Sequence, residues 1–357
     1  MRRSVVIIVA LAVGLIGACS PSTPSPPPTS SPIATASPAA SPTMSPAASD
    51  AGIPLADRLE AEIAVEGSPD WPLAAFDSIW VLAPDLPLVD DSATPNLLRI
   101  DPATNEVAAT IPLPDRLCQG FTASEDAIWA CAADALIRID PATNEITDTV
   151  PITGAQYAYR PAAGAGYLWF LGSGDSVADT VLALDTGAKS TRTFRQSGTV
   201  GRMAYAFDAL WLTIPAEGAV VRFDPVTEES EVVTTGLPNP TGIVAGPDSL
   251  WVSLHGANDD QAGAGDTQLV RIDPESGEMT AEFAIGGSPQ WGVEAWAGDD
   301  AVYVRSTTPW MVHIDPATNE IVETITSDEA IQGPLTVAFD SIWTVNLEHD
   351  NVFRLTP

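Results

Sequence analysis

The sequence is poor in positive charge, in histidine and in cysteine. Its 357 residues contain 15 lysines and arginines against 47 aspartates and glutamates, which gives a formal net charge of −32 at pH 7. Such a chain repels phosphate backbones and anionic lipid headgroups, so nucleic acid is a poor candidate partner. The three histidines and three cysteines form no CxxC pair and no Cys/His cluster, which argues against a zinc site.

Sequence motifs of the common enzyme classes are also missing. We find no nucleophile elbow, no HExxH pair, no phosphate-binding loop and no convincing pair of catalytic acids. Many of the acidic residues have a structural explanation, because an aspartate recurs at two turn positions in nearly every repeat described below. Such side chains accept hydrogen bonds from backbone amides of their own turn. The acidic excess therefore indicates turns and solubility, with halophily or calcium affinity as lesser alternatives.

The N-terminal residues have the order of an export signal. Arg2 and Arg3 precede an apolar run from Val5 to Ile16, which is too short to span a bilayer comfortably. The next residues end at Cys19, and Ile16–Cys19 resembles a bacterial lipobox, which implies cleavage before Cys19 and a diacylglycerol on its sulfur. An ordinary signal peptide cleaved nearby is the alternative. We therefore expect an extracytoplasmic protein that is lipid-anchored to a bacterial membrane, with residues 1–18 as its lipoprotein signal.

Residues 19–50 are expected to be the lipidated cysteine and a disordered tether. This stretch is almost entirely Ser, Pro, Thr and Ala, so it has too little apolar surface to offset the entropy of ordering. At about 3.1 Å per residue, a Pro-rich stretch of this length extends on the order of 100 Å. That reach is enough to hold a domain clear of the membrane.

Residues 51–357 carry an internal repeat of about forty residues. One phrase, LRIDPATNE at Leu98–Glu106, predicts strand, turn and strand, because Asp bonds the turn amides, Pro fixes φ and Asn accepts a left-handed conformation. Related phrases lie at Ile137–Glu145, Val221–Glu229, Val270–Glu278 and Val312–Glu320, with a degraded copy at Ala183–Ala188. A second phrase, Asp-x-(Ile/Leu/Val)-aromatic, recurs seven times, at Trp80, Trp129, Trp169, Trp211, Trp251, Tyr303 and Trp343. The repeat length is that of a four-stranded propeller blade.

The two ends of the folded region complement each other. The chain stops at Arg354–Pro357, in register with Arg99–Pro102, so the seventh repeat lacks its fourth strand. Leu59–Val65 has the pattern of that missing strand. Pairing the two segments would close a ring and leave no open sheet edge. The sequence therefore predicts an all-β, monomeric, seven-bladed β-propeller closed by the N-terminal strand of the folded region.

The repeats resemble those of the YVTN/YncE-type propellers and of the virginiamycin B lyase-like superfamily. The resemblance covers the whole folded region and rests on blade-building motifs, which identify an architecture that hosts unrelated functions. As an alternative function it implies a metal-dependent carbon–oxygen lyase, in which a histidine base and a magnesium ion open a cyclic depsipeptide by elimination. His255 and Glu294 are the nearest available acid–base combination.

Loop lengths place the candidate site on one face. Long insertions at Ala83–Asn96, Leu171–Thr180 and His255–Gln268 fall between second and third strands, whereas the other turns are tight. When the seven repeats are aligned on the Asp-x-aromatic turn, one residue near the start of each innermost strand falls at the same position of the alignment. We call this the ring register, and it contains Trp71, Gly120, Arg160, Arg202, Gly242, Glu294 and Pro334.

Two arginines at the ring register, Arg160 and Arg202, form with Trp71 a candidate clamp for a carboxylate or a planar ring. An open alternative is that Glu294 pairs with an arginine across the channel and fills it. Polar and stacking contacts are expected from neighbouring residues, namely Asn239, Gln290 and Trp291.

Candidate calcium or magnesium ligands lie in a Gly-rich insertion, namely Asp259, Asp260 and Asp266, although their spacing matches no established calcium loop.

Cys118 and Cys131 remain as an even pair if Cys19 carries lipid. They flank a predicted hairpin, so a cross-strand disulfide is geometrically possible in an oxidising compartment, with two separate buried thiols as the alternative.

Taken together, the sequence favours a binding module without chemistry of its own. It would capture a small molecule, glycan or protein at the loop-rich face and channel mouth.

Overall fold

The computed structural model describes residues 44–45, 52–83, 95–114, 117–132, 135–152, 157–173, 180–196, 198–255, 267–287, 295–328, 333–346 and 349–357. The predicted signal, Cys19 and most of the predicted tether lie outside these ranges. Within them, no helix is long and apolar enough to cross a membrane.

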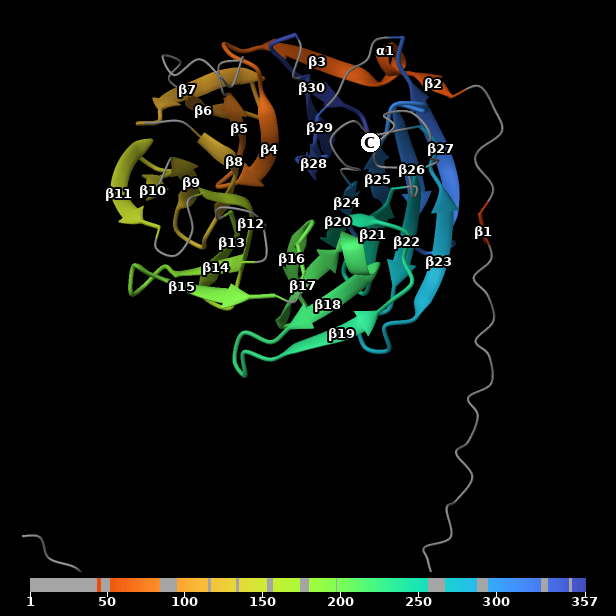
Figure 1. Ribbon diagram of the computed structural model, residues 1–357. Coiled ribbons are helices and arrows are strands. Elements are labelled where there is room, and N and C mark those ends of the chain that lie inside the picture. Colours follow the sequence, from red (N-terminus) through yellow and green to blue (C-terminus); the bar gives the residue numbers. More distant parts are fainter. Residues whose placement is uncertain are drawn as a thin grey trace, which may run out of the picture. The chain divides into compact units, whose positions relative to one another are not determined.

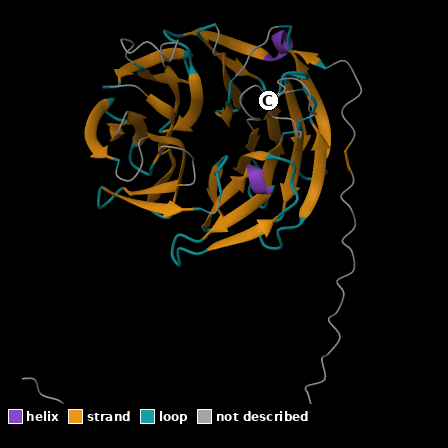
Figure 2. Ribbon diagram, in the orientation of Figure 1, coloured by secondary structure: helices purple, strands orange, loops and turns teal. Residues whose placement is uncertain are grey.

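Seven antiparallel blades of four strands each make up the folded region (Figure 1, Figure 2). Blade 1 consists of β4 (Asp70–Ala75), β5 (Ser78–Ala83), β6 (Asn96–Asp101) and β7 (Glu106–Pro112); blade 2 of β8 (Leu117–Ala123), β9 (Ile128–Ala132), β10 (Ala135–Asp140) and β11 (Glu145–Pro151); and blade 3 of β12 (Tyr157–Gly164), β13 (Tyr167–Ser173), β14 (Thr180–Asp185) and β15 (Ser190–Arg195). Blade 4 consists of β16 (Met203–Ala206), β17 (Ala209–Ile214), β18 (Ala219–Phe223) and β19 (Ser230–Thr234); and blade 5 of β20 (Pro240–Ala245), β21 (Leu250–Leu254), β22 (Gln268–Ile272) and β23 (Met279–Ala284). Blade 6 consists of β24 (Ala295–Ala297), β25 (Val302–Arg305), β26 (Met311–Asp315) and β27 (Glu320–Thr326); and blade 7 of β28 (Leu335–Ala338), β29 (Ser341–Asn346), β30 (Asn351–Leu355) and β3 (Leu59–Ala64).

The first strand of each blade lies nearest the central axis, where it contacts the first strands of both neighbouring blades (Figure 1). Two short segments add a parallel strand to an outer edge: β1 (Met44–Ser45) pairs with β23, and β2 (Ile53–Pro54) pairs with β27. The helices of the described ranges are α1 (Leu55–Arg58) and a 3-10 helix at Pro215–Glu217. The predicted all-β propeller is therefore confirmed.

The ring is closed by the segment that precedes blade 1. β3 pairs antiparallel with β30, with Leu59 opposite Leu355. Next to this pairing, the carbonyl of Arg58 accepts a hydrogen bond of 2.9 Å from the backbone amide of Thr356. The closure predicted from the two chain ends is confirmed, and it gives blade 7 the same four strands as the other blades.

The repeat aromatic residues form the centre of each blade. All seven are at most 3% exposed, and four of the tryptophans donate an indole hydrogen bond of 2.9–3.1 Å to the carbonyl five residues earlier. They also join neighbouring blades, since Trp80 of blade 1 packs in one cluster with Ile128 and Ile137 of blade 2. Burial of roughly 200 Å² of aromatic surface contributes on the order of 5 kcal/mol before chain entropy is subtracted. Their predicted packing role is confirmed.

The Asp-Pro turns have the conformation that the repeat predicts. Asp101 Oδ1 accepts a hydrogen bond of 2.8 Å from the amide of Ala103, and Asn105 at the end of the same turn has a φ of +59°. Left-handed φ values also occur at the equivalent residues Asn144, Asn319 and Gly277. These are the residue types that tolerate this region at least cost.

Backbone amides stabilise the ionised carboxylates of these turns. Hydrogen bonds from the amides of Thr227 and Val226 lower the pKa of Asp224, and those from the amide and hydroxyl of Ser276 lower the pKa of Asp273. Because each folded-state pKa lies below the unfolded one, the contribution to stability is complete at neutral pH and disappears as the pH falls through the lowered pKa. Part of the acidic excess therefore maintains the turns.

An arginine connects blade 7 to blade 1. Arg354 Nη1 donates to the carbonyl of Pro102 at 2.7 Å and to Asn105 Oδ1 at 3.0 Å. Its Nε donates to Ser341 Oγ at 2.9 Å, and its guanidinium lies 5.1 Å from the ring centroid of Trp343. We call this arrangement the arginine latch. Equivalent latches connect blade 1 to blade 2 through Arg99, Ser78, Pro141 and Asn144, and blade 5 to blade 6 through Arg271, Ser249, Pro316 and Asn319.

The latch requires three residue types that only some repeats supply. It occurs where a serine stands two residues before the repeat tryptophan, an arginine stands on the third strand, and an asparagine ends the turn of the next blade. Arg138 of blade 2 precedes a turn with Lys189 at that position and instead bonds Asp126 and Thr147 of its own blade. Arg222 of blade 4 precedes a turn with Gly277. The sequence therefore specifies which blades are connected.

We expect Arg354→Lys to destabilise the protein more than Arg222→Lys by about 1–2 kcal/mol. Lysine keeps the charge but lacks the planar fork that bonds serine, carbonyl and amide oxygens together. Arg222 occupies the same register with no asparagine ahead of it, so it is the matched control. Urea unfolding measures both, and equal losses would show that the latch adds nothing to ring closure.

Candidate functional site

The innermost strands are irregular at or beside the ring register. The register of pairing between the first and second strands shifts by one residue, as in a β-bulge, between Asp70 and Pro72 in blade 1 and between Pro240 and Gly242 in blade 5. Similar shifts occur in blades 2 and 3. A bulge of this kind bends the strand and redirects a side chain out of the regular alternation. Ring-register side chains can therefore face the central axis while the rest of each strand packs between blades.

Trp71 has an unusual backbone conformation at this position. Its φ is +46°, in the left-handed region, and its amide donates to Asp70 Oδ1 at 2.9 Å. The ring-register residue of blade 2 is Gly120, which also has a positive φ of +108°. A bulky aromatic residue is a genuine outlier in a conformation that glycine adopts freely, and such strain is concentrated at functional sites.

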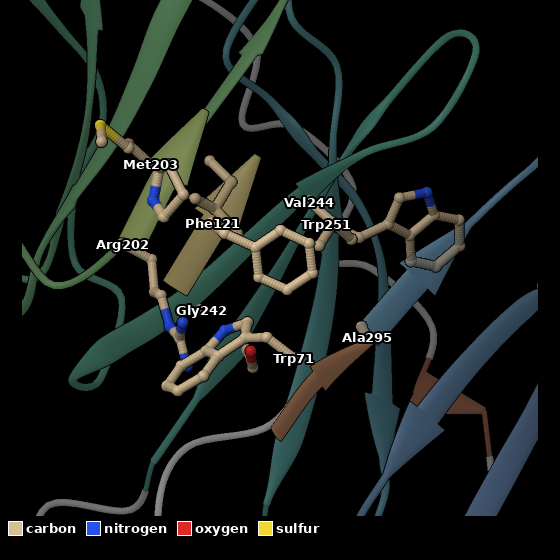
Figure 3. A pocket seen from close by; sticks show the side chains of 11 residues that line it. Trp71, Phe121, Arg202, Met203, Gly242, Val244, Trp251 and Ala295 are labelled. Atoms are coloured by element: carbon tan, nitrogen blue, oxygen red, sulfur yellow. The ribbon is translucent and has the colours of Figure 1, made fainter. Parts of the chain in front are cut away.

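The structure brings together three ring-register residues, Trp71, Arg202 and Gly242, around one pocket of about 120 Å³ (Figure 3). We call it the mouth pocket. Trp71 and Arg202 are both half-buried, so the pocket communicates with solvent. In Figure 3 the Arg202 side chain extends toward the indole of Trp71. Trp71 and Arg202 therefore line the same pocket, and their role as a clamp stays a prediction.

Arg202 is held through its backbone. Its amide donates to Thr213 Oγ1 at 2.9 Å, and its carbonyl accepts from the amide of Thr213 at 3.0 Å. Thr213 is fully buried on β17. The guanidinium therefore extends from a fixed point on blade 4.

The remaining wall of the mouth pocket is mostly apolar and was missed from the sequence. Five lining residues stand one position after the ring register, namely Phe121, Pro161, Met203, Ile243 and Ala295. Val244, Trp251 and Ser253 of blade 5 complete the lining. The recurrence at one register is a signal that the repeat alignment contained. Regular alternation would turn that position away from the axis, and the bulges change the alternation.

Other predicted residues lie near the same face. The amide of His255 donates to the carbonyl of Asn239 at 3.1 Å, which joins these two residues just beyond the pair formed by Pro240 and Leu254. Arg160 belongs to β12, but its side chain lies outside the described part of the structure. Outside the described residues altogether lie Glu294, Gln290, Trp291, Asp259, Asp260 and Asp266.

No group of three or more His, Cys, Asp or Glu side chains lies close enough to hold a metal ion among the residues that the structure describes. The predicted calcium or magnesium site falls on residues beyond that part, and it stays a prediction.

Cys131 is fully buried on β9. Leu117 pairs with Ala132, so the backbone register brings the next residue, Cys118, to the strand segment facing Cys131. The side chain of Cys118 is outside the described set, and the disulfide also stays a prediction.

The fold and its central pocket define the class of the protein as a seven-bladed β-propeller. Similar solved structures are the WD40 domain of Neurospora crassa Pan2 (8% identity, TM-score 0.62, covering 82% of this chain and 90% of that chain) and U3-55K (11% identity, TM-score 0.64, covering 85% and 100%). A third is BamB from Moraxella catarrhalis (13% identity, TM-score 0.54, covering 84% and 99%). At such identities the likeness shows the fold alone. No protein-family model and no curated protein matches the sequence.

We expect Trp71→Gly to be more stable than Trp71→Ala by roughly 1 kcal/mol, because glycine accepts the positive φ without strain. At Leu73 on the same strand, which lacks a positive φ, the order should reverse. Thermal unfolding of the four variants checks this. A Trp71→Ala variant as stable as Trp71→Gly would remove the argument from backbone strain.

Proposed function

We propose that this protein is an extracytoplasmic, lipid-anchored binding protein that captures a small molecule in the mouth pocket. The observation that carries the proposal is Trp71, a large aromatic residue kept in a glycine-type conformation where its side chain lines a pocket beside Arg202. Phe76, Phe207 and Phe339 also have positive φ values, but they lie in the tight turns between the first and second strands, whereas Trp71 lies within the innermost strand β4. Backbone strain inside a strand that lines a pocket is typical of a functional position.

The shape of the site favours a small molecule over a glycan or a protein. The mouth pocket is concave, and aliphatic and aromatic side chains line it together with a small number of polar groups, which is the usual composition of a small-molecule site. Its lining residues come from six blades, most of them on the innermost strands, and not from one flexible loop. A rigid scaffold of this kind keeps the site formed before the ligand arrives.

The YVTN/YncE-type repeat phrase and the lipobox-like segment ending at Cys19 support the rest of the proposal. They suggest a propeller carried outside the cytoplasm on a tether. The contact with the membrane would be made by the lipid on Cys19, and the strongly acidic chain would not adhere to anionic headgroups.

A pocket-filling substitution tests the binding proposal. In a thermal-shift screen of small organic acids, amines and sugars, at least one compound should raise the melting temperature of the unmodified protein. A ligand at 100 times its Kd adds about 2.7 kcal/mol of stability. The shift should disappear in Ala295→Phe and Val244→Phe, which fill the mouth pocket, and persist in Ala206→Phe, which lies outside the lining on β16. A shift that survives both filling variants would place binding elsewhere, and no shift with any compound would refute the proposal.

The anchor has its own test. Cys19→Ser removes the acceptor of the lipid, so we expect the variant to be released into the medium while the unmodified protein stays with the membrane fraction. Immunoblots of both fractions measure this, with Cys131→Ser as the cysteine control. Membrane retention of Cys19→Ser would contradict lipidation at this residue.

A further inference from the structure

The junction between blade 6 and blade 7 has a histidine where the arginine latches have their arginine. In the three latches, the arginine of the third strand lies over the repeat tryptophan and donates through Nη1 to the carbonyl of a proline in the next blade. Blade 6 has His313 and Tyr303 at these two positions, and their ring centroids are 4.6 Å apart. Histidine lacks the length and the planar fork of arginine, so it cannot make the same set of hydrogen bonds.

Arg58 makes the connection between these two blades from another direction. Pro357 stands in register with Pro102, whose carbonyl accepts from Arg354 in the latch between blade 7 and blade 1. The backbone oxygen of Pro357 accepts a hydrogen bond of 3.0 Å from Arg58 Nη1. Arg58 Nη2 donates to the carboxylate of Glu323 on β27 of blade 6, and the two side chains of this ion pair are 23% and 19% exposed. One guanidinium therefore links blade 6 to the turn position of blade 7.

His313 lies next to this ion pair. It is directly opposite Glu323 in the pairing of β26 with β27, and directly opposite Tyr303 in the pairing of β25 with β26. Residues directly opposite each other in antiparallel strands share one face of the sheet, so Tyr303, His313 and Glu323 form a row that ends at Arg58. We propose that this row is a pH-sensitive latch, in which protonation of His313 draws Glu323 away from Arg58 and loosens the ring between blades 6 and 7.

The groups around His313 come from four elements. Glu323 on β27 and Asp315 on the same strand as His313 favour the imidazolium, whereas Arg58 of α1 disfavours it. Burial raises the pKa of the Tyr303 phenol on β25, so this group stays neutral at physiological pH. The side chains of blade 7 that pack in one cluster with Tyr303 are apolar, namely Ile342, Phe353 and Leu355.

Burial decides the balance of these effects. Desolvation of the half-buried imidazole lowers the pKa of His313, and the charge of Arg58 lowers it further, while Glu323 and Asp315 act in the opposite direction. Because the folded-state pKa lies below the unfolded one, neutral His313 favours the folded junction. Its contribution to stability is complete above the unfolded pKa of about 6.5 and disappears as the pH falls from there through the folded pKa.

The segment that Arg58 fixes is the one that closes the ring. Just before it, β2 pairs with β27, with Ile53 opposite Ile325. The carbonyl of Arg58 accepts from the amide of Thr356 where β3 begins to pair with β30. Loss of the contact with Glu323 would remove the charged link between this segment and blade 6. We therefore expect acid to cause local opening at α1 and β3 and not unfolding of the whole ring.

Hydrogen exchange of the full chain, measured by mass spectrometry and corrected for the intrinsic rate, tests the proposal. From about pH 7.5 to about pH 5.5, amides of α1 and β3 should lose protection at least about twofold, while those of β10 and β11 in blade 2 keep theirs. His313→Gln is neutral at both pH values and should abolish the loss. His349→Gln removes an exposed histidine of blade 7 and should leave the loss unchanged. A loss of the same size in His313→Gln and in the unmodified protein would overturn the proposal.

Glu323→Gln tests the role of Arg58 in the same measurement. Without the carboxylate, Arg58 has lost its partner on blade 6 at every pH, so β3 should already have low protection at pH 7.5 and change little on acidification. Protection at pH 7.5 equal to that of the unmodified protein would show that the ion pair does not hold the closure.

The titration of His313 can also be measured in the unmodified protein. The sequence has three histidines, so their imidazole NMR signals can be followed individually with pH. We expect the midpoint for His313 to lie below the ordinary histidine pKa of about 6.5. A midpoint at or above that value would contradict the direction of the switch, whatever the variants show.

Discussion

The pairing of β3 with β30 is the constraint on which the rest of the molecule depends. It joins segments separated by almost the whole folded region, as the hydrogen bond between Asn351 and Glu62 across 289 positions of sequence shows. A row of blades without this pairing would leave two exposed sheet edges and no fixed centre. With it, the first strands of all seven blades face one axis, and residues such as Trp71 and Arg202, 131 positions apart by their numbering, meet at one pocket.

Two kinds of interaction keep the blades in register around that closure. The repeat tryptophans are buried between neighbouring blades. Their apolar packing has no preferred direction, and only the indole hydrogen bond does. The arginine latch is directional, because the guanidinium must meet serine, carbonyl and amide oxygens at once. Bulk packing thus gives most of the stability of the blades, while the latches specify how particular blades follow one another. The bulges at the ring register interrupt this order only where side chains must face the axis.

The fold could be predicted from the sequence almost completely because it is repetitive. The phrase around Asp101 fixed the turns and their left-handed asparagines, and the unmatched strand at Leu59–Val65 indicated the closure. Of the candidate site, Trp71, Arg202 and Gly242 line one pocket in the structure, and their role in binding stays a prediction. Phe121 and its equivalents were missed because strict alternation assigns them to the wrong face. A bulge depends on how two strands pair, and no single position in the chain reports it. The remaining candidates belong to loop insertions whose composition carries no repeat, and sequence alone gives such loops no register.

The uneven distribution of the latches has a consequence for how the ring opens. In the described structure they connect blade 5 to blade 6 and join blade 7, blade 1 and blade 2 in succession. The arc from blade 2 to blade 5 has apolar packing and more exposed polar contacts, among them the ion pairs Lys189–Asp148 and Arg192–Glu228, and exposed pairs contribute little stability. Transient separation of blades should therefore begin in that arc, where the free energy of local opening is lowest. Trp71 belongs to blade 1, which has a latch on both sides, and Arg202 belongs to blade 4, in the arc without latches. A molecule bound by both residues would connect these two parts of the ring across the axis. It would thereby reduce local opening in the arc that has no latch.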